Sequence, residues 1–381
     1  MAGPVASDVA EKCLRLSLTP QLGPRRFAQL LERYDDIDTA LGLSASALAG
    51  LDRVGRKTAE TIARGRDAVD VRPELDRAAE LGVRICCQLD DDYPTLLRHI
   101  ADPPICLYVR GTLQADDASA LGIVGSRRCS HYGQEQARRF GFLAAQAGLT
   151  VVSGLAYGID TFAHYGALDC PSGRTIAAMG CGLGHVYPER NVELADRIAE
   201  AGAVISELPL DTAPDKTNFP GRNRIIAGLS LGTLVIEGTL RSGALITARH
   251  AVEYNREVFA IPGRVDSPYA AGPHHLIAQS EAKLVTRAED VFEELGDVGR
   301  RLLGDADVAE AVTAVPGVSP PLDAQETRIV DVLTPDPQHL SELAERSGLS
   351  NARVAAAMIR LQLKGVAKQL PGSLYVKVTR S

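Results

Sequence analysis

The sequence predicts an α/β protein built on an extended Rossmann-like parallel sheet, flanked by a small N-terminal helical domain of the SAM or helix-hairpin-helix type and a C-terminal winged helix. Short β-rich runs alternate with helical segments through the middle of the chain, and helical periodicity dominates both ends. A chain of 381 residues is expected to form two or three domains. We expect the helical domain at residues 1–72, the Rossmann-like domain at 73–295, a proline-containing linker at 296–322 and the winged helix at 323–381.

The composition is that of an ordinary globular protein, with 45% apolar and 23% charged residues. The formal net charge of -7 disfavours a nucleic-acid ligand for the surface as a whole, so a local basic patch must carry any such function. Seven cysteines without a C-x-x-C pair predict neither a disulfide framework nor a metal site, and favour a cytoplasmic location. No signal peptide or apolar run of membrane-spanning length is found, so no membrane association is expected.

The N-terminal segment, residues 9–72, carries leucines and other apolar residues at helical spacing. Residues 22–27 (LGPRRF) and 54–59 (VGRKTA) are similar to two helix-hairpin-helix turns, in which glycine N–H groups approach a DNA phosphate. Gln21 and Arg53 stand where such turns usually have an earlier glycine. Both interpretations stay open: a phosphate site, or turns that pack a small domain.

The middle of the chain is predicted to contain a series of strands that alternate with helices. Residues 83–87 and 105–109 are expected to be strands that precede a main sheet, because Asp-Pro and Tyr-Pro breaks separate them. The strands of the main sheet are expected at residues 121–124, 150–152, 175–179, 203–207, 233–236 and 257–261. Their alternation with helices predicts a parallel sheet with helices on both faces.

Glycine-rich loops follow three of these strands, at residues 122–128 (GIVGSRR), 153–160 (SGLAYGID) and 180–184 (GCGLG). The first precedes a helix that begins near Gly133, and Gly125 would let an anion approach the backbone. One such loop would be interpreted as a turn, but three loops at the carboxyl ends of parallel strands, together with Arg127, favour a ligand site. None has G-x-G-x-x-G spacing, so a dinucleotide cofactor is not expected. Asp160 and His164 lie four residues apart, where they would bond each other.

The most informative segment is 216–224 (KTNFPGRNR), which brings three cations and one aromatic ring within nine residues. No acidic residue occurs from 216 to 236. Cations neutralise phosphates and a ring stacks on any unpaired base, so this composition predicts a single-strand nucleic-acid site. Pro220 is expected to stiffen a turn, with a helix continuing over residues 222–230.

Seven ordered motifs identify a family. They are GIVGSRRCSHYG, VVSGLAYGIDTFAH, AAMGCGLGHVYPERN, ISELPL, NFPGRNRIIAGLS, VIEGTLRSGALITARHA and VFAIPG. Together they resemble the DprA family, also called Smf, of DNA-processing proteins, over about residues 81–292. Family members often have Asn in the motif that here reads GPHHLI, which leaves the role of His274 open.

The resemblance implies a Rossmann-like protein that dimerises through this domain, binds single-stranded DNA, helps to load the recombinase RecA in transformation or recombination, and catalyses no reaction. The family's GSR arginine matches Arg127, its pocket lysine and aromatic match Lys216 and Phe219, and its R-N-R pair matches Arg222 and Arg224. The whole candidate site comprises Gly125, Ser126, Arg127, Gly154, Lys216, Asn218, Phe219, Arg222, Asn223, Arg224, Ser242 and Gly243. Two residues keep structural alternatives: Arg224 could pair with Glu237, and Phe219 could belong to the core.

An enzymatic alternative rests on Glu237, which resembles the acidic position of LOG-type nucleoside-monophosphate phosphoribohydrolases. In this alternative Glu237 acts on the sugar and Arg222 holds the phosphate. The leading P-G-G of the motif in those enzymes is missing here, where residues 228–233 read GLSLGT. Release of adenine from AMP would support the alternative.

The C-terminal segment is basic, with seven cations and no acid between residues 346 and 381. On a helix expected over residues 350–364, Arg353, Arg360 and Lys364 fall within about 40° of one another, beside an apolar stripe. These three residues are candidate secondary nucleic-acid contacts. A solvated basic face is an equally good interpretation.

Overall fold

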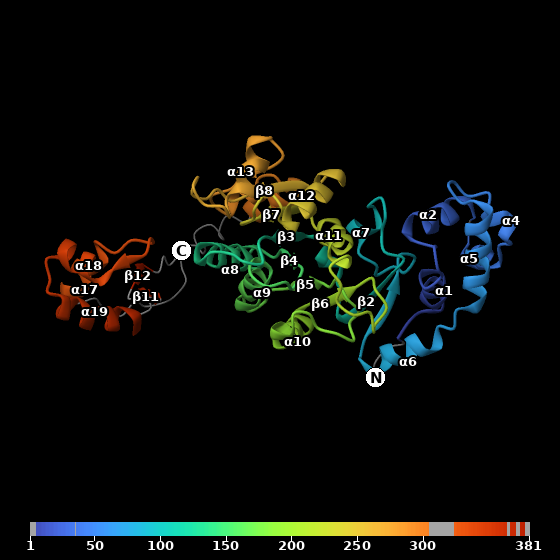
Figure 1. Cartoon of the computed structure of the whole chain (residues 1–381), viewed down its shortest axis with the longest axis horizontal. Coiled ribbons are helices and arrows are strands. Elements are labelled where there is room, and N and C mark those ends of the chain that lie inside the picture. The colour runs from blue at the N-terminus through green and yellow to red at the C-terminus, as the bar shows by residue number, and fades with distance from the viewer. Residues whose placement is uncertain (1–4, 35, 305–323, 364–365, 371–373, 378–381) are drawn as a thin grey trace. The chain divides into compact units, whose positions relative to one another are not determined.

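The computed structural model describes residues 5–34, 36–304, 324–363, 366–370 and 374–377 (Figure 1). Its backbone contacts divide the chain into two compact units, Met1–Gly304 and Asp305–Ser381. Among the described helices, none is both long enough and apolar enough to cross a membrane.

In the described residues, six helices precede the first strand. They are α1 (Asp8–Ser17), α2 (Pro24–Arg33), α3 (Ile37–Gly42), α4 (Ala45–Leu48), α5 (Arg56–Ala68) and α6 (Arg72–Glu80). Their buried side chains, such as Leu14 and Phe27, belong to the same hydrophobic core as Ile85 and Ile198 of the α/β part. The N-terminal helices are therefore packed onto the sheet domain, and α6 runs across the expected boundary at residue 72.

One nine-stranded sheet forms the centre of the larger unit. Its strand order is β1 (Arg84–Cys87), β2 (Cys106–Gly111), β6 (Ala203–Ser206), β5 (Thr175–Ala178), β4 (Thr150–Ser153), β3 (Ala120–Val124), β7 (Gly232–Val235), β8 (Glu257–Ala260) and β9 (Lys283–Leu284). The strands from β6 to β9 pair in parallel, as the alternating pattern predicts. β1 and β2, expected to precede the main sheet, instead complete it as an antiparallel edge, and β9 was not predicted.

Alternate residues of β3 face two different cores. Ala120 and Val124 share one core with residues of α11 (Asn218–Leu229) and α12 (Gly243–Glu253). Leu121 and Ile123 share the other with α8 (His131–Gln146) and α9 (Ile159–Asp169). Figure 1 accordingly shows α11 and α12 on one side of the sheet and α8 and α9 on the other. Burial on both faces explains why these strands are almost continuously apolar.

The remaining elements of this unit are short. They are α7 (Thr95–Arg98), a 3-10 turn (Ala115–Ala118), another (Glu189–Asn191), α10 (Val192–Ala201), α13 (Ala271–Ala278), α14 (Glu289–Phe292) and α15 (Gly296–Gly304). α15 forms a helix over the first nine residues of the expected linker. The rest of that linker, residues 305–322, lies outside the described residues.

The smaller unit has three helices and a terminal hairpin, together with one short strand, β10, that was not predicted. It comprises α17 (Ala324–Val330), β10 (Gln338–His339), α18 (Leu340–Ser347), α19 (Asn351–Leu363), β11 (Ala367–Leu370) and β12 (Leu374–Lys377). Its antiparallel sheet has the order β10-β12-β11, and Ile329, Leu343 and Leu361 lie in its own core. Three helices followed by a hairpin confirm the predicted winged helix.

Candidate nucleic-acid site

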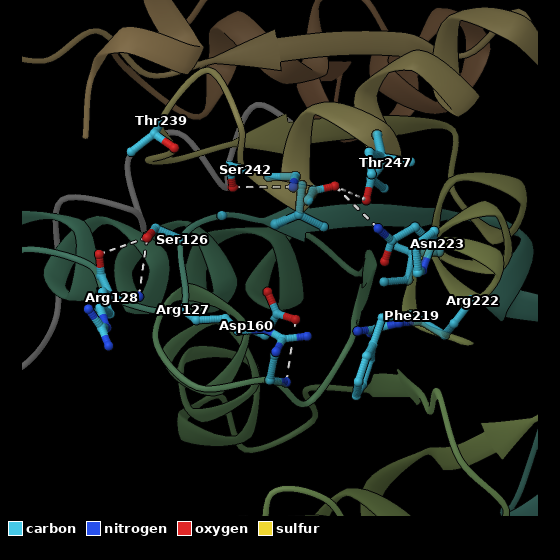
Figure 2. A pocket seen from close by; sticks show the side chains of 18 of the residues that line it. Ser126, Arg127, Arg128, Asp160, Phe219, Arg222, Asn223, Thr239, Ser242 and Thr247 are labelled. Atoms are coloured by element: carbon cyan, nitrogen blue, oxygen red, sulfur yellow. Dashed lines mark hydrogen bonds between the residues drawn. The ribbon is translucent and has the colours of Figure 1, made fainter. Parts of the chain in front are cut away.

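Loops from the carboxyl ends of the parallel strands meet the start of α11 and the start of α12 around a pocket of about 750 Å³ (Figure 2). This size falls within the range of roughly 300–1,000 Å³ that is common for ligand sites. The residues that carry its chemistry are Ser126, Arg127, Arg128, Asp160, Lys216, Phe219, Arg222, Asn223, Thr239, Ser242, Gly243, Thr247 and Tyr269. The pocket therefore lies where parallel α/β sheets bind their ligands.

The charge of the pocket is positive. Arg127, Arg128 and Lys216 are exposed at its walls, while Arg222 is buried with 4% of its surface exposed. Among the described residues that line the pocket, Asp160 is the one carboxylate set against these four cations. An excess of fixed positive charge attracts an anionic ligand, although the chain as a whole is acidic.

Arg222 is held in place by the backbone around it. Its Nη1 donates to the carbonyl of Ala178 at 3.0 Å, and a Cβ added at Gly154 would overlap its guanidinium. Burial lowers the pKa of Arg222, and the nearby Asp160 carboxylate opposes that shift. Among the described contacts, the buried Nε of Arg222 has no hydrogen-bond partner. A buried donor without a partner is costly, so this group is available for an acceptor supplied by a ligand.

Phe219 is half-buried and carries cations around its ring. The Arg127 guanidinium lies 4.6 Å from the ring centroid and that of Arg222 lies 5.9 Å away, both within cation–π range. The absence of a side chain at Gly180 makes room for the ring, since a Cβ there would be 2.7 Å from Phe219 Cδ1. The alternative that Phe219 is a core residue is not what the structure shows.

The glycine loops serve side-chain packing as well as backbone approach. A Cβ at Gly125 would overlap Ile159 at the start of α9, so this glycine is required for close contact between the first two loops. Ser126 donates its backbone N–H to the Glu237 carbonyl at 2.7 Å, which fixes the first loop against the end of β7. Close packing between the loops therefore requires glycine at 125, in addition to any approach of an anion to the backbone.

The opposite wall comes from α12. Ser242 caps this helix by accepting from Ala244 N at 3.3 Å, so the helix begins at Gly243. Asn223 Nδ2 donates to the Gly243 carbonyl at 3.2 Å and ties α11 to α12 (Figure 2). Sequence reasoning missed Thr247, although its position four residues after Gly243 places both on one helix face.

Two other wall residues, Pro268 and Tyr269, also went unpredicted. They lie in the segment between β8 and α13, and no motif marks them. The chain returns there to the pocket because the Tyr269 carbonyl accepts from Gly238 N at 2.7 Å, a contact that the sequence does not reveal.

Nine of the twelve predicted residues line the pocket, and Gly154 lines a neighbouring hollow. Asn218 and Arg224 line neither. α11 begins at Asn218 rather than at residue 222, so Pro220 lies in the first helical turn, where its missing N–H costs nothing. Arg224 points to an ion pair with Glu207 at 2.6 Å and lies 3.5 Å from Asp102, so its partner is not Glu237.

Glu237 does not face the pocket. Its carboxylate accepts from the backbone N–H of Ser130 at 2.8 Å and from the Ser130 hydroxyl at 2.5 Å, immediately before α8. The side chain is 6% exposed and does not line the pocket. The Glu237 carboxylate therefore accepts from donors at a helix start. The phosphoribohydrolase alternative requires this carboxylate in the pocket, and the structure does not place it there. In the described part of the chain, no three His, Cys, Asp or Glu side chains are grouped to hold a metal ion.

The expected bond between Asp160 and His164 is wrong. His164 Nδ1 pairs with Thr175 Oγ1 at 2.7 Å, and Asp160 accepts from Ala156 N at 3.4 Å while lying near Arg222. The two side chains have different neighbours, since Asp160 lines the pocket and His164 contacts Thr175 of β5. Burial raises the pKa of Asp160, and the positive charges of Arg222 and Arg127 oppose that shift.

His274, whose role was left open, contacts the backbone of Gly263 through Nε2.

The two hairpin turns near the N-terminus have matching geometry. Gly23 and Gly55 are the N-caps of α2 and α5, and Gln21 (φ 63°) and Arg53 (φ 55°) adopt the left-handed backbone of the glycines that they replace.

In the winged helix Arg353 is exposed on α19. Arg360 lies on the same helix, and Lys364 lies outside the described residues.

Comparison with known proteins identifies relatives for both the sheet domain and the winged helix. The family model of DNA recombination-mediator protein A matches residues 84–296, and that of the DprA winged helix domain matches residues 314–373. The DNA processing protein DprA of Bacillus subtilis is 38% identical over 293 residues, which cover 76% of this chain and 96% of that protein.

The solved structures that resemble the chain include two of DNA processing protein A. The X-ray structure of DNA processing protein A from Streptococcus pneumoniae has a TM-score of 0.65 and 36% identity, covering 75% of this chain and 97% of that one. The structure that describes the single-stranded DNA binding mode of DNA processing protein A from Helicobacter pylori has a TM-score of 0.50 and 27% identity, covering 59% and 98%.

Fold and pocket together define a Rossmann-like protein with a positively charged pocket and an appended winged helix. The chain belongs to the DNA recombination-mediator protein A (DprA) family, because the family model matches more than half of it. This family is one of recombination mediators rather than enzymes.

Proposed function

We propose that this chain binds single-stranded DNA in the pocket between α11 and α12 and acts as a recombination mediator through that binding. The observation that carries the proposal is the buried Arg222, which has an unpartnered Nε and lines the same pocket as the exposed Arg127 and Lys216. A phosphate supplies the acceptor that Arg222 lacks, and two exposed cations neutralise neighbouring phosphates. The relative from Helicobacter pylori, whose structure describes single-stranded DNA binding, supports the choice of ligand.

The preference for a single strand follows from the aromatic groups of the site. Phe219 and Tyr269 both line the pocket, so an unpaired base that enters can stack on an aromatic ring. In a duplex the bases are stacked on one another and hidden from such rings. The start of α12 at Ser242 and Gly243 adds backbone N–H groups beside the cations.

The wider role follows from the family. We infer that the chain delivers the bound strand to the RecA recombinase and works in the cytoplasm as a homodimer joined through its Rossmann-like domain. The seven free cysteines, six of them buried, fit a reducing compartment. Arg353, with Arg360 and Lys364, is a candidate second contact to nucleic acid. Co-precipitation with purified RecA tests the association with the recombinase, and sedimentation analysis tests the homodimer.

The central test is an equilibrium titration of single-stranded and duplex oligonucleotides of equal length at two salt concentrations. We expect tighter binding of the single strand. Lys216→Glu and Arg127→Glu should each weaken it, and each lost phosphate contact should lower the log–log salt slope by about 0.7. Arg249→Glu is the matched control, because Arg249 is an exposed cation of α12 that does not line the pocket.

Two results would count against the proposal. Equal affinity of the wild-type chain for both oligonucleotides would remove the single-strand site altogether. Wild-type affinity and slope in both charge-reversal variants would show that DNA binds elsewhere on the chain.

A further inference from the structure

A second, narrower hollow adjoins the pocket. Its walls include Arg127 and Phe219, which also line the main pocket, and two tyrosines, Tyr157 and Tyr187, which do not. Because the two hollows share residues, a strand that leaves the main pocket past Arg127 reaches the tyrosines next. The sequence motifs assign no ligand contact to either tyrosine.

Both tyrosines are unusually exposed for large aromatic residues. Tyr157 has 42% of its surface exposed and Tyr187 has 39%. The ring of Phe219 is less accessible, since Arg127 lies 4.6 Å from its centroid and Tyr187 lies 5.8 Å away at 44°. Much of the free aromatic surface on this side of the site therefore belongs to the tyrosines.

The loop that presents Tyr157 is fixed on both sides. Leu155 is fully buried, its carbonyl accepts from Asn191 Nδ2 at 2.8 Å, and the Ala156 carbonyl accepts from Thr161 Oγ1 at 2.7 Å. On the other side Gly158 has a φ of 77° and packs against the first glycine loop. A ring held outward by an ordered backbone loses little conformational entropy when a base stacks on it.

The size of the hollow determines how it could be used. With a volume of about 10 Å³ it is too small to enclose a base, so a ligand must lie across the ring faces. Stacking on a face tolerates any base, because every base has one. We propose that Tyr157 and Tyr187 form a second base-stacking platform, which extends the single-strand site beyond Arg127 and Phe219. This inference rests on the proposed function.

The test compares short and long oligothymidylates, of ~4 and ~16 nucleotides, the limits of common single-strand site sizes. Tyr157→Ala should lower the affinity for the long oligonucleotide by about 5- to 100-fold, as expected for one lost stacked base, and change the affinity for the short one less than ~2-fold. Tyr187→Ala should act in the same direction. Tyr157→Phe and Tyr187→Phe keep the rings and should restore wild-type binding.

Tyr132→Ala is the matched control, because Tyr132 is 45% exposed on α8 and lines neither hollow. A direct readout uses the wild-type chain: a long oligonucleotide that carries 5-iodouracil is cross-linked by light, and the adducts are mapped by mass spectrometry. We expect adducts on the peptides that contain Tyr157 or Tyr187.

The outcomes distinguish a failure of the tyrosine platform from a failure of the proposed single-strand binding. If the wild-type chain fails to prefer single strands, the proposed function itself fails. If it prefers them but both alanine variants bind the long oligonucleotide as the wild type does, or if adducts form only at Phe219 and Tyr269, the platform is refuted and the pocket stands. Equal weakening for both lengths would also refute it, because the tyrosines would then support the main pocket.

Discussion

His164 shows how burial fixes the state of one residue. Its side chain is 0% exposed, and Thr175 Oγ1, which it contacts, already donates to the Val151 carbonyl at 2.7 Å. His164 must therefore donate from Nδ1, which leaves Nε2 without a proton and, among the described contacts, without a partner. Burial, and then the positive charge of Arg222, lower the pKa of His164 to about 3.

This shift predicts a pH-dependent stability. An unperturbed histidine has a pKa of about 6.5, so between roughly pH 6.5 and 3 the unfolded chain binds one more proton than the folded chain at this position. The free energy of unfolding should fall as the pH drops through that window, by up to about 1.4 kcal/mol per pH unit from this residue. His164→Asn keeps a donor near the position of Nδ1 and should make the slope shallower, as measured by urea unfolding at several pH values.

His99→Asn serves as the control, because His99 is an exposed histidine on the same unit and should leave the slope unchanged. An unaltered slope in the His164 variant would mean that another group causes the loss of stability in acid.

At the scale of the element, the two N-terminal hairpins are informative. Each keeps the left-handed residue of a helix-hairpin-helix turn, yet uses Gln21 and Arg53 in place of glycine. Left-handed backbone costs an L-residue about 1–2 kcal/mol, whereas glycine adopts it freely. The fold of the two hairpins evidently outweighs this local preference, since α2 and α5 begin directly after the turns.

Substitution by glycine should therefore stabilise the chain. We expect Gln21→Gly and Arg53→Gly each to raise the free energy of unfolding by up to about 1 kcal/mol, the relief of strain exceeding the added entropy of the unfolded chain. Arg64→Gly, at an exposed position in the middle of α5, should lower it by about 1 kcal/mol. Chemical denaturation measures all three, and a loss of stability in both turn variants would contradict the strain argument.

At the scale of the whole molecule, the chain consists of two units with separate cores. Three hydrophobic clusters lie within residues 1–304, and a fourth lies within the winged helix. A small unit buries a smaller fraction of its surface on folding and is correspondingly less stable. The larger unit contains every residue that lines the candidate pocket.

Residues 1–304 alone should therefore fold and retain single-strand binding in the main pocket. Calorimetry of the full chain should show two transitions, the earlier from the winged helix, and the fragment should reproduce the later one. A single transition in the full chain, together with an unfolded fragment, would show that the units depend on each other.

Much of the fold could be predicted because its causes are local. Apolar runs bounded by glycine give the parallel strands. β1 and β2 were located correctly but not joined to the sheet, since pairing between distant strands leaves no local pattern. In the site, Arg127, Lys216, Phe219 and Arg222 could be found by residue type and spacing.

The sequence by itself determined the family, the parallel sheet and the cations of the pocket, because residue type and spacing along the chain suffice for these. Only the tertiary structure decided which neighbours each side chain meets. Arg222 and Arg224 are two residues apart on α11, yet one lines the pocket and the other pairs with Glu207. Successive side chains of a helix point about 100° apart, so what each one contacts depends on the elements packed around that helix.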